Sequence, residues 1–518
     1  MRLIEYFDRG ARMNPDGMAF VTHDRSVEMP YSEVETLSHR IAAALHREGL
    51  RPQAPVAILS GNSVLAFPCV LGVLRSGCAW VALNARSTME DMVALLDLVE
   101  AQALLFQSEL AEIADQIGEQ VASLLCQVEI GGAKSGKPTL AEWIAPADTK
   151  VPLPPLDGDA TTAFFGTGGT TGRPKVVEIP NRAFETMIHA FLAHLPERSP
   201  VHLVAAPLTH AAGTGVFPVL TVGGTNVVHK SVDPGEILSS IERNQVTRLF
   251  LPPTAIYSLL THDDVKTRDL SSLEYFLYGA APMSVEKLKA AIDTFGPVMA
   301  QFYGQTELPM LCAFLSPEEH VEALRDPRLI QRLRSCGRPS VVADIAIMDD
   351  TGQIMPSGAS GEIVVRSSLR MTGYHKAPHQ TAAVQRPGGW QATGDIGYLD
   401  TSGYLYIVDR KRDLIISGGF NVFPSEVEQV LWEHPAVRDC AVIGLPDEKW
   451  GERVTAVVEV ELGQSVSEAE LISLAKKKIG SVRAPKEVIF RSLPRSDTGK
   501  ILKRQLRDEY WRNQDRLI

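Results

Sequence analysis

Two kinds of hydrophobic pattern alternate along the chain. Apolar residues in the segment 34–45 lie three or four positions apart, which predicts a helix. The segment 56–59 is apolar throughout and is followed by the turn residues Gly61 and Asn62, which predicts a buried strand. Further strands are predicted at 201–206, 247–251, 275–278 and 298–302, and a further helix at 285–295. The alternation predicts an α/β fold, with helices on both faces of a parallel or mixed sheet.

The pattern changes between residues 343 and 407. Short strand-like runs at 345–348, 362–366 and 403–407 are separated by glycines there. This texture predicts a small β-rich subdomain that closes the large domain.

A new unit begins after residue 412. Ser425 and Glu428 have the spacing of a helix capping box, and Ser467 and Glu470 repeat it. Residues 413–518 are therefore predicted to form a second domain of the α+β type.

Composition and charge narrow the choice of function. The chain has 518 residues, of which 45% are apolar and 22% charged, as in globular proteins, and this length suggests about three structural units at roughly 150 residues each. The net charge of −11 argues against a protein built to coat nucleic acid.

The cysteines and the N-terminus indicate a cytoplasmic protein. The cysteines are too scattered for a zinc site and too few for a disulfide scaffold: Cys69, Cys78, Cys126, Cys312, Cys336 and Cys440. Charged residues interrupt the first twenty positions, so no signal peptide is expected. The most apolar run, 66–74, is about half as long as a membrane span, which excludes an integral membrane segment and leaves peripheral association open.

The strongest local signal is the segment 162–175, in which an apolar strand enters a loop rich in glycine and threonine. Glycine lacks a Cβ, so successive backbone N–H groups of such a loop can approach anionic oxygens closely. The candidate phosphate-binding residues are Thr167, Gly168, Gly169, Thr170, Thr171, Gly172 and Lys175. The loop lacks the Walker spacing, and composition alone also allows a plain surface loop.

Further motifs accompany this loop along the chain. In order they span 207–213, 279–282, 303–307, 393–395, 409–421 and 494–500. Together with the loop they resemble the adenylate-forming superfamily, which includes acyl-CoA synthetases, adenylation domains of nonribosomal peptide synthetases and firefly luciferase. The resemblance covers nearly the whole chain.

The resemblance implies a two-step reaction and a two-domain architecture. A carboxylate attacks the α-phosphate of ATP and releases pyrophosphate, and the acyl group then moves to a thiol. Because this chemistry brings like charges together, fixed donors, Mg²⁺ and a cation near the α-phosphate should supply most of the catalysis. Implied are a large domain over 1–409 with a β-barrel-like subdomain at about 340–409, a hinge at 410–412, and a mobile small domain over 413–518.

The resemblance also implies roles for single residues around the nucleotide. Glu307 would bind Mg²⁺, Thr306 would contact phosphate, and Lys500 would bridge the carboxylate and the α-phosphate. Asp395 and Arg410 would hold the ribose, although such a pair is often only an ion pair. The adenine contacts would be Tyr303 and Gly304 with the backbone of Gly279, Ala280 and Ala281, although Tyr303 alone could equally be a core residue.

The remaining implied roles concern the acid, the thiol and the hinge. His210 would lie at the mouth of the acyl pocket, or else be structural. Gly418 and Gly419 would line the pantetheine tunnel of CoA, or else serve turn geometry. Arg412 falls at the hinge position, where Lys or Asp is usual.

The loop departs from the family pattern at two positions. Gly168 replaces a serine, and the loss of its hydroxyl donor costs on the order of 1 kcal/mol. Val176 replaces a glycine, which would matter if the backbone there needed a positive φ. Slower or absent adenylation, with thiolation retained, is therefore an open alternative.

The leading prediction is an ATP-dependent acid:CoA ligase whose partners are a small-molecule carboxylic acid and CoA, with a homodimer possible. No aspartate lies between Pro207 and Gly215 to pair with an ammonium group, so a free amino acid is disfavoured. Thr209 in place of a bulky aromatic suggests room for a medium-chain, bulky or aromatic acid. Alternatives are loading of a carrier protein, binding without turnover and, remotely, luciferase-like oxygenation.

Overall fold

The large N-terminal part of the chain contains two α/β sheets. A computed structural model gives the structure and describes residues 1–145, 150–155, 157–167, 175–208, 211–410, 413–447, 449–495 and 501–511. The first sheet has the order β15-β14-β13-β12-β11-β9-β10-β1-β2. Its strands are β1 (Met18–Thr22), β2 (Glu28–Pro30), β9 (Val201–Val204), β10 (Thr225–Val228), β11 (Arg248–Leu251), β12 (Tyr275–Tyr278), β13 (Met299–Gln305), β14 (Leu308–Leu315) and β15 (Arg338–Pro339). The six central strands of this sheet run parallel: β13, β12, β11, β9, β10 and β1. Antiparallel strands lie at both edges, β14 and β15 at one and β2 at the other.

The second sheet has the order β18-β8-β7-β4-β3-β5-β6. Its strands are β3 (Pro55–Ser60), β4 (Ala79–Asn84), β5 (Ala103–Gln107), β6 (Cys126–Ile130), β7 (Thr161–Thr167), β8 (Lys175–Pro180) and β18 (Gly373–Tyr374). Five neighbouring strands of this sheet run parallel: β7, β4, β3, β5 and β6. The strands β8 and β18 extend the sheet beyond β7 in antiparallel pairs. The predicted alternation of parallel strands and helices is therefore observed.

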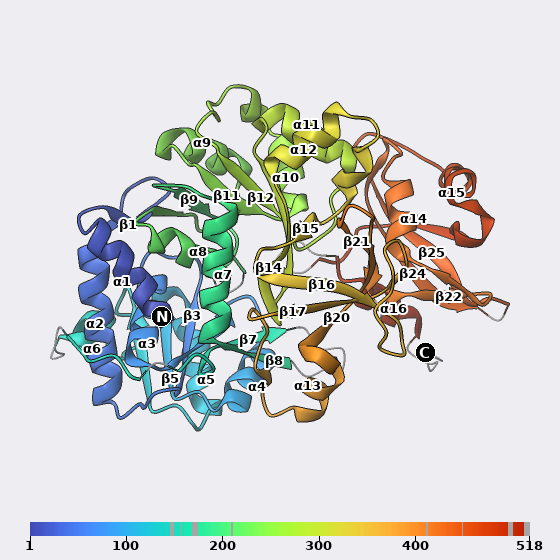
Figure 1. Cartoon of the computed structure of the whole chain (residues 1–518). Helices are drawn as coiled ribbons and strands as arrows, with labels where there is room; N and C mark the ends of the chain where they lie inside the picture. Colours follow the sequence, from blue (N-terminus) through green and yellow to red (C-terminus); the bar gives the residue numbers. More distant parts are fainter. Residues whose placement is uncertain are drawn as a thin grey trace.

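Helices flank both sheets (Figure 1). They are α1 (Leu3–Met13), α2 (Tyr31–Arg47), α3 (Ala66–Ser76), α4 (Met89–Val99), α5 (Ala111–Gln120), α6 (Leu140–Ile144), α7 (Asn181–His194), α8 (Ala211–Thr221), α9 (Pro234–Asn244), α10 (Pro253–Leu260), α11 (Val285–Phe295), α12 (Pro317–Arg325) and α13 (Pro378–Val384). The apolar run 66–74 lies in α3, where every residue is buried. A helix that is apolar on all sides needs such an environment. Among the described residues no helix is long and apolar enough to cross a membrane.

A five-stranded antiparallel sheet follows, as the glycine-punctuated pattern predicts. It consists of β16 (Ala343–Met348), β17 (Gly361–Ser367), β19 (Gln385–Arg386), β20 (Trp390–Leu399) and β21 (Leu405–Arg410). The strands β20 and β21 pair up to Asp395 and Arg410, so these two residues stand opposite each other.

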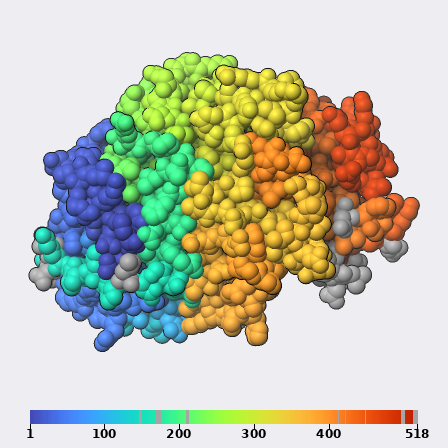
Figure 2. Space-filling view, in the orientation of Figure 1, coloured from blue at the N-terminus to red at the C-terminus, as the bar shows by residue number. Residues whose placement is uncertain are grey.

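The C-terminal unit combines a sheet and helices and lies beside the five-stranded sheet, at the red end of the colour bar in Figure 2. Its strands are β22 (Ile415–Ser417), β23 (Phe420–Val422), β24 (Val437–Asp447), β25 (Gly451–Val460) and β26 (Glu487–Phe490), and its helices are α14 (Pro424–Leu431), α15 (Glu468–Arg483) and α16 (Lys503–Trp511). The domain boundaries 1–409, 410–412 and 413–518 stay predictions.

One of the two predicted capping boxes is present and the other is wrong. Ser467 caps α15, and Glu470 completes the box. Phe423 is the N-cap of α14, so Ser425 lies inside the helix. The Ser425 backbone N–H donates to Asp409 (2.9 Å), and the Glu428 carboxylate accepts from Val442 N–H (2.6 Å). The Ser425 N–H and the Glu428 carboxylate thus bind tertiary partners and do not bind each other, which the local spacing could not reveal.

Candidate active site

The hairpin of β13 and β14 carries two of the predicted site residues at its turn. The predicted strand ends at residue 302, but β13 continues to Gln305 because β14 supplies an antiparallel partner, with Gln305 opposite Leu308. Thr306 and Glu307 therefore form a tight turn, and Gly304 lies within the strand. A Cβ at Gly304 would lie 2.5 Å from the backbone of Met310, so only glycine fits this hairpin.

Tyr303, Asp395 and Arg410 form a connected group between the first sheet and the five-stranded sheet. The Tyr303 hydroxyl donates to Asp395 Oδ2 (2.7 Å), and Arg410 Nε lies 3.3 Å from Asp395 Oδ1. Burial, followed by the charge of Asp395, raises the pKa of Tyr303 well above its usual value. The tyrosine therefore acts as a neutral donor that orients the carboxylate.

The group is closed on one side and open on the other. The Asp395 side chain is 8% exposed, whereas that of Arg410 is 40% exposed. A buried carboxylate beside an exposed guanidinium can exchange partners with a ligand that offers hydroxyl groups.

The predicted adenine-contacting backbone follows β12. Ala280 has a φ of +67°, a left-handed conformation that is uncommon for a residue with a side chain. Such positions often accompany binding sites. A Cβ at Gly279 would lie 2.8 Å from the Phe302 carbonyl oxygen, which places Gly279 beside β13.

The glycine-rich loop connects the ends of a paired hairpin. Thr167 ends β7, and Lys175 begins β8 opposite it. The Thr167 hydroxyl donates to the Lys175 carbonyl oxygen (3.3 Å). Val176 pairs with Gly166 in the same ladder and is not among the residues with positive φ, so the expected backbone conflict at Val176 does not arise.

Tyr374 links this hairpin to Glu307, and the sequence reasoning missed it. The Lys175 ammonium lies 4.9 Å from the centre of the Tyr374 ring, and the Tyr374 hydroxyl donates to Glu307 Oε1 (2.8 Å). Burial, followed by the charge of Glu307, raises the pKa of Tyr374. Tyr374 belongs to the two-residue strand β18, which carries no motif that would single it out.

Two family descriptions match the sequence, AMP-binding enzyme over residues 7–375 and AMP-binding enzyme C-terminal domain over residues 426–500. The chain belongs to the AMP-binding enzyme family.

Named relatives and one solved structure agree with this family. The chain is 37% identical to the medium/long-chain-fatty-acid–CoA ligase FadD8 of Mycobacterium tuberculosis, over 90% of this chain and 83% of that protein. It is 33% identical to a feruloyl-CoA synthase of Amycolatopsis sp., over 97% of this chain and 98% of that protein. The amide bond synthetase McbA from Marinactinospora thermotolerans is 30% identical, with a TM-score of 0.88 over 98% of this chain and all of McbA. The predicted superfamily, the α/β fold class and the assignment to the acid–thiol ligases are confirmed.

Several of the predicted site residues lie outside the described part of the chain. They are Gly168, Gly169, Thr170, Thr171 and Gly172 of the phosphate loop, His210, the hinge residue Arg412, and Lys500. The described flanks of Lys500 are paired, since Arg495 and Ile501 form an antiparallel bridge and Leu502 N–H donates to the Pro494 carbonyl oxygen (2.8 Å).

Gly418 and Gly419 form the turn between β22 and β23. Their φ angles are +59° and +80°, and a Cβ at Gly418 would lie 2.9 Å from the ring of Trp450. Turn geometry and ring packing therefore already require glycine here. The role of this backbone toward a thiol remains a prediction.

A buried ion pair lies close to the Lys500 segment. Lys503 Nζ is 2.7 Å from Glu428 Oε1, and both side chains are mostly buried. Burial raises the pKa values of Glu428 and of Asp409. Burial alone would lower the pKa of Lys503, but the charges of Glu428 and Asp409 raise it.

A cavity of about 410 Å³ lies between the first α/β region and the C-terminal unit. Met283, Lys289 and Arg334 line it from one side, and Gln429 and Trp432 from the other. No predicted site residue in the described part of the chain lines it, so it is separate from the Tyr303–Asp395–Arg410 group.

Proposed function

We propose that this AMP-binding enzyme is an ATP-dependent acyl-CoA ligase. It joins a carboxylic acid to AMP with release of pyrophosphate and then transfers the acyl group to the thiol of CoA. One observation carries the proposal: β13 and its turn bring together two groups, Tyr303 with Asp395 and Arg410, and Glu307 with Tyr374 and Lys175. The first group suits a nucleoside, and the second suits its phosphates.

The first group has the donors and acceptors that a ribose needs. Asp395 accepts hydrogen bonds from the ribose hydroxyls, and Arg410 donates to the same sugar. Tyr303, together with Gly304 and the Gly279–Ala281 backbone, lies against the adenine. The aromatic ring and the exposed edge of the backbone supply stacking and hydrogen bonds.

The second group lies where the phosphate chain would extend. The hairpin ends Thr167 and Lys175 fix the two ends of the phosphate loop, and Thr306 offers a hydroxyl on the turn of β13. The Lys175 ammonium adds a positive charge for the β- and γ-phosphates.

Glu307 fits the Mg²⁺ that the family implies. Mg²⁺ is usually held by one or two carboxylates together with substrate phosphates and water. Tyr374 binds Oε1 of the half-buried Glu307 carboxylate, and no other described side chain donates to this carboxylate, so Oε2 would be left for the ion. The ion would neutralise phosphate charge, while Tyr374 holds the carboxylate in place.

The relatives support an apolar acid. FadD8 is named for medium- and long-chain fatty acids, and the Amycolatopsis enzyme for ferulic acid, which is aromatic. Both agree with a medium-chain, bulky or aromatic substrate. The family resemblance implies that His210 would lie at the mouth of the acyl pocket, and that Thr209, in place of a bulky aromatic, would leave room for such an acid.

A thiolation-only enzyme remains the second candidate because Gly168 replaces a serine in the phosphate loop. The extended backbone at Val176 removes the other reason for doubting adenylation. The lost hydroxyl alone weakens phosphate binding by on the order of 1 kcal/mol, about five- to tenfold. That loss slows adenylation and does not abolish it.

Purified enzyme with ATP, Mg²⁺ and a panel of fatty and aromatic acids tests the proposal. Pyrophosphate release and acyl-CoA formation are measured separately, and both are expected. Pyrophosphate release without acyl-CoA formation would indicate that the acyl acceptor is a carrier protein or another molecule, and not CoA. Thioester made only from synthetic acyl-adenylate would establish the thiolation-only enzyme, and neither product would favour a binding protein.

The Lys500→Ala variant separates the two steps. Pyrophosphate formation should fall by about 100-fold or more, because a cation placed at the developing charge supplies much of the catalysis. Thiolation of supplied acyl-adenylate should be retained, and Lys478→Ala, at an exposed ion pair of the same unit, is the matched control. An equal loss of both steps would contradict a role limited to adenylation.

The remaining assignments concern the molecule as a whole. Arg412 is the hinge about which the small domain turns, presenting either Lys500 or the Gly418–Gly419 backbone to the site. A cytoplasmic location and a homodimer stay predictions, which fractionation and light scattering would test.

A further inference from the structure

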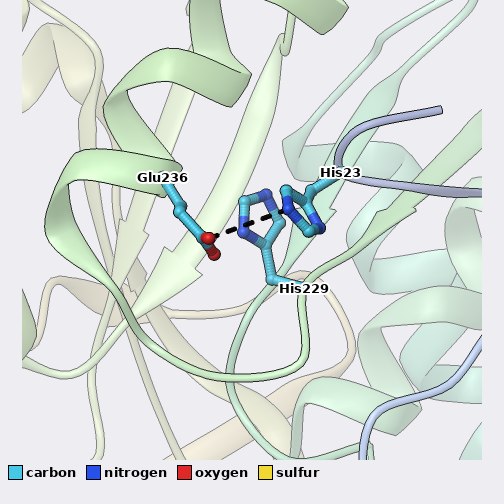
Figure 3. Close-up of side chains that lie close together, drawn as sticks. All are labelled: His23, His229 and Glu236. Atoms are coloured by element: carbon cyan, nitrogen blue, oxygen red, sulfur yellow. Dashed lines mark ion pairs between the residues drawn. The ribbon is translucent and has the colours of Figure 1, made fainter. Parts of the chain in front are cut away.

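We propose that His23, His229 and Glu236 form a binding site for a divalent transition-metal ion of the Zn²⁺ type. Their ligand atoms all lie within 4.8 Å of one another. Figure 3 shows the two rings side by side, with the carboxylate next to them. In the described part of the chain this is the only such group of three or more His, Cys, Asp or Glu side chains.

The sheet register brings the two histidines together. Thr22, the last residue of β1, pairs in parallel with Val228, the last residue of β10, so the residue after each strand is a histidine at the same edge. His23 N–H donates to the Val228 carbonyl oxygen (3.2 Å), and the ring centres of His23 and His229 are 5.0 Å apart. The strand pairing and this backbone hydrogen bond fix the relative positions of the two histidine backbones, and so the points from which the rings extend.

Helix α9 supplies the carboxylate. Glu236 lies in its first turn, where its backbone N–H donates to the N-cap Asp233 (2.8 Å). Glu236 Oε1 lies 3.9 Å from His23 Nε2, the pair joined by the dashed line in Figure 3. The carboxylate thus faces the rings from a third element.

His229 is the observation that points to a ligand. It is completely buried, and neither of its ring nitrogens has a hydrogen-bond partner among the described residues. Leaving a buried polar group without a partner is destabilising, so a fold that keeps a histidine here needs a partner for it. A metal ion bound to one ring nitrogen would supply that partner.

The donor set selects the class of ion. Two imidazoles and one carboxylate suit Zn²⁺ and similar ions, with water completing the coordination, whereas Mg²⁺ prefers oxygen ligands alone. Tetrahedral Zn²⁺ places its ligand atoms roughly 3.3 Å apart. The side chains of His23 and Glu236 are 24% and 53% exposed, so they are free to close the remaining distance and to admit the ion from solvent.

The surrounding charges do not oppose a cation strongly. Asp233 and Arg243 both act electrostatically on His229, with opposite signs. Arg243 is turned toward Ser239 Oγ (3.2 Å) and, weakly, toward the His23 carbonyl oxygen (3.4 Å). The carboxylates of Asp233 and Glu236 outnumber this arginine around the site.

The site is distinct from the Mg²⁺ position at Glu307. Three strands, β12, β11 and β9, lie between β13 and β10 in the sheet. At the usual spacing between neighbouring strands, the distance from β13 to β10 is roughly 19 Å. The ion would join the N-terminal strand β1 to helix α9 and so have a structural effect.

Titration of the full chain, free of any histidine tag and stripped with chelator, tests the proposal. Zn²⁺ followed by calorimetry should bind with a stoichiometry near one, and Co²⁺ should give the visible absorption of a site with nitrogen ligands. Millimolar Mg²⁺ should not compete. If the full chain binds neither Zn²⁺ nor Co²⁺, water satisfies His229 and the proposal is overturned.

Variants locate the ion. Glu236→Gln changes an exposed side chain and His23→Ala a partly exposed one. Each should weaken Zn²⁺ binding by about 100-fold or more, beyond the roughly 10- to 100-fold cost of altering an outer-shell partner. His229→Ala should abolish binding, with circular dichroism to confirm folding. His379→Ala, an exposed histidine on α13, and Glu307→Gln should leave binding unchanged. Equal binding by Glu236→Gln, His23→Ala and the controls would contradict the assignment.

Discussion

Asp409 and Arg410 are neighbours at the end of β21, yet they serve two different ion-pair groups. Arg410 pairs with Asp395, and its head group is partly exposed. Asp409 accepts from Ser425 N–H (2.9 Å) and adds its charge to the buried Lys503–Glu428 pair. Successive residues of a strand point to opposite faces, so one strand end contributes to both groups.

The difference between the two groups lies in what each can exchange. The Asp395–Arg410 pair has an open side, so a ligand can replace part of its interactions. The Lys503–Glu428 pair is enclosed, and each charge there depends on the other. Residues of the same chemical types thus form the proposed ribose-binding group in one place and an enclosed structural ion pair in the other.

Breaking the enclosed pair should have the largest effect. Lys503→Met leaves the buried Glu428 and Asp409 without their cation, and we expect the free energy of unfolding of the C-terminal unit to fall by about 3–5 kcal/mol. Urea denaturation followed by circular dichroism measures it. Lys478→Met, at the exposed Lys478–Glu433 pair, should cost less than about 1 kcal/mol. Equal costs for the two variants would contradict a structural role of the Lys503–Glu428 pair.

Breaking the open pair should damage activity more than stability. Asp395→Asn removes the charge that we propose accepts hydrogen bonds from the ribose hydroxyls, so kcat/KM for ATP in pyrophosphate release should fall by about 100-fold or more. Asp344→Asn, at an exposed ion pair of the same sheet, is the control and should leave kcat/KM unchanged. An unchanged kcat/KM for ATP in Asp395→Asn would contradict the proposal that Asp395 binds the ribose.

A smaller loss is expected from the exposed half of the pair. Arg410→Ala removes one hydrogen-bonding partner from a group that is already partly solvated, so the KM for ATP should rise by about tenfold. A loss as large as that of Asp395→Asn would show that Arg410 does more than contact the sugar.

The smallest effect tests the residue that links the phosphate hairpin to the turn. Tyr374→Phe keeps the ring beneath Lys175 and removes the hydroxyl donated to Glu307, so the Mg²⁺ concentration for half-maximal pyrophosphate release should rise by less than about tenfold. An unchanged Mg²⁺ dependence, with activity lost in Glu307→Gln, would reduce Tyr374 to a packing role.

Local patterns in the sequence were enough to predict the elements and the family. The helix α11 spans the predicted residues 285–295, and the Ser467–Glu470 box begins α15, because periodicity and capping act within a few residues. The glycine-rich loop, the Tyr303–Glu307 turn and the Asp395 motif identified the family for a similar reason: each carries its chemistry on consecutive residues.

Only the tertiary structure decided which side chains meet. Tyr374 binds Glu307, which lies 67 positions earlier in the chain. The Ser425 backbone N–H binds Asp409 and is not part of a capping box. His23 and His229 lie together because their strands pair in register. Such contacts depend on how the sheets pack, and a buried polar group takes whichever partner that packing brings near it. No spacing along the chain records that choice, so the enclosed ion pair and the histidine site emerged only from the folded molecule.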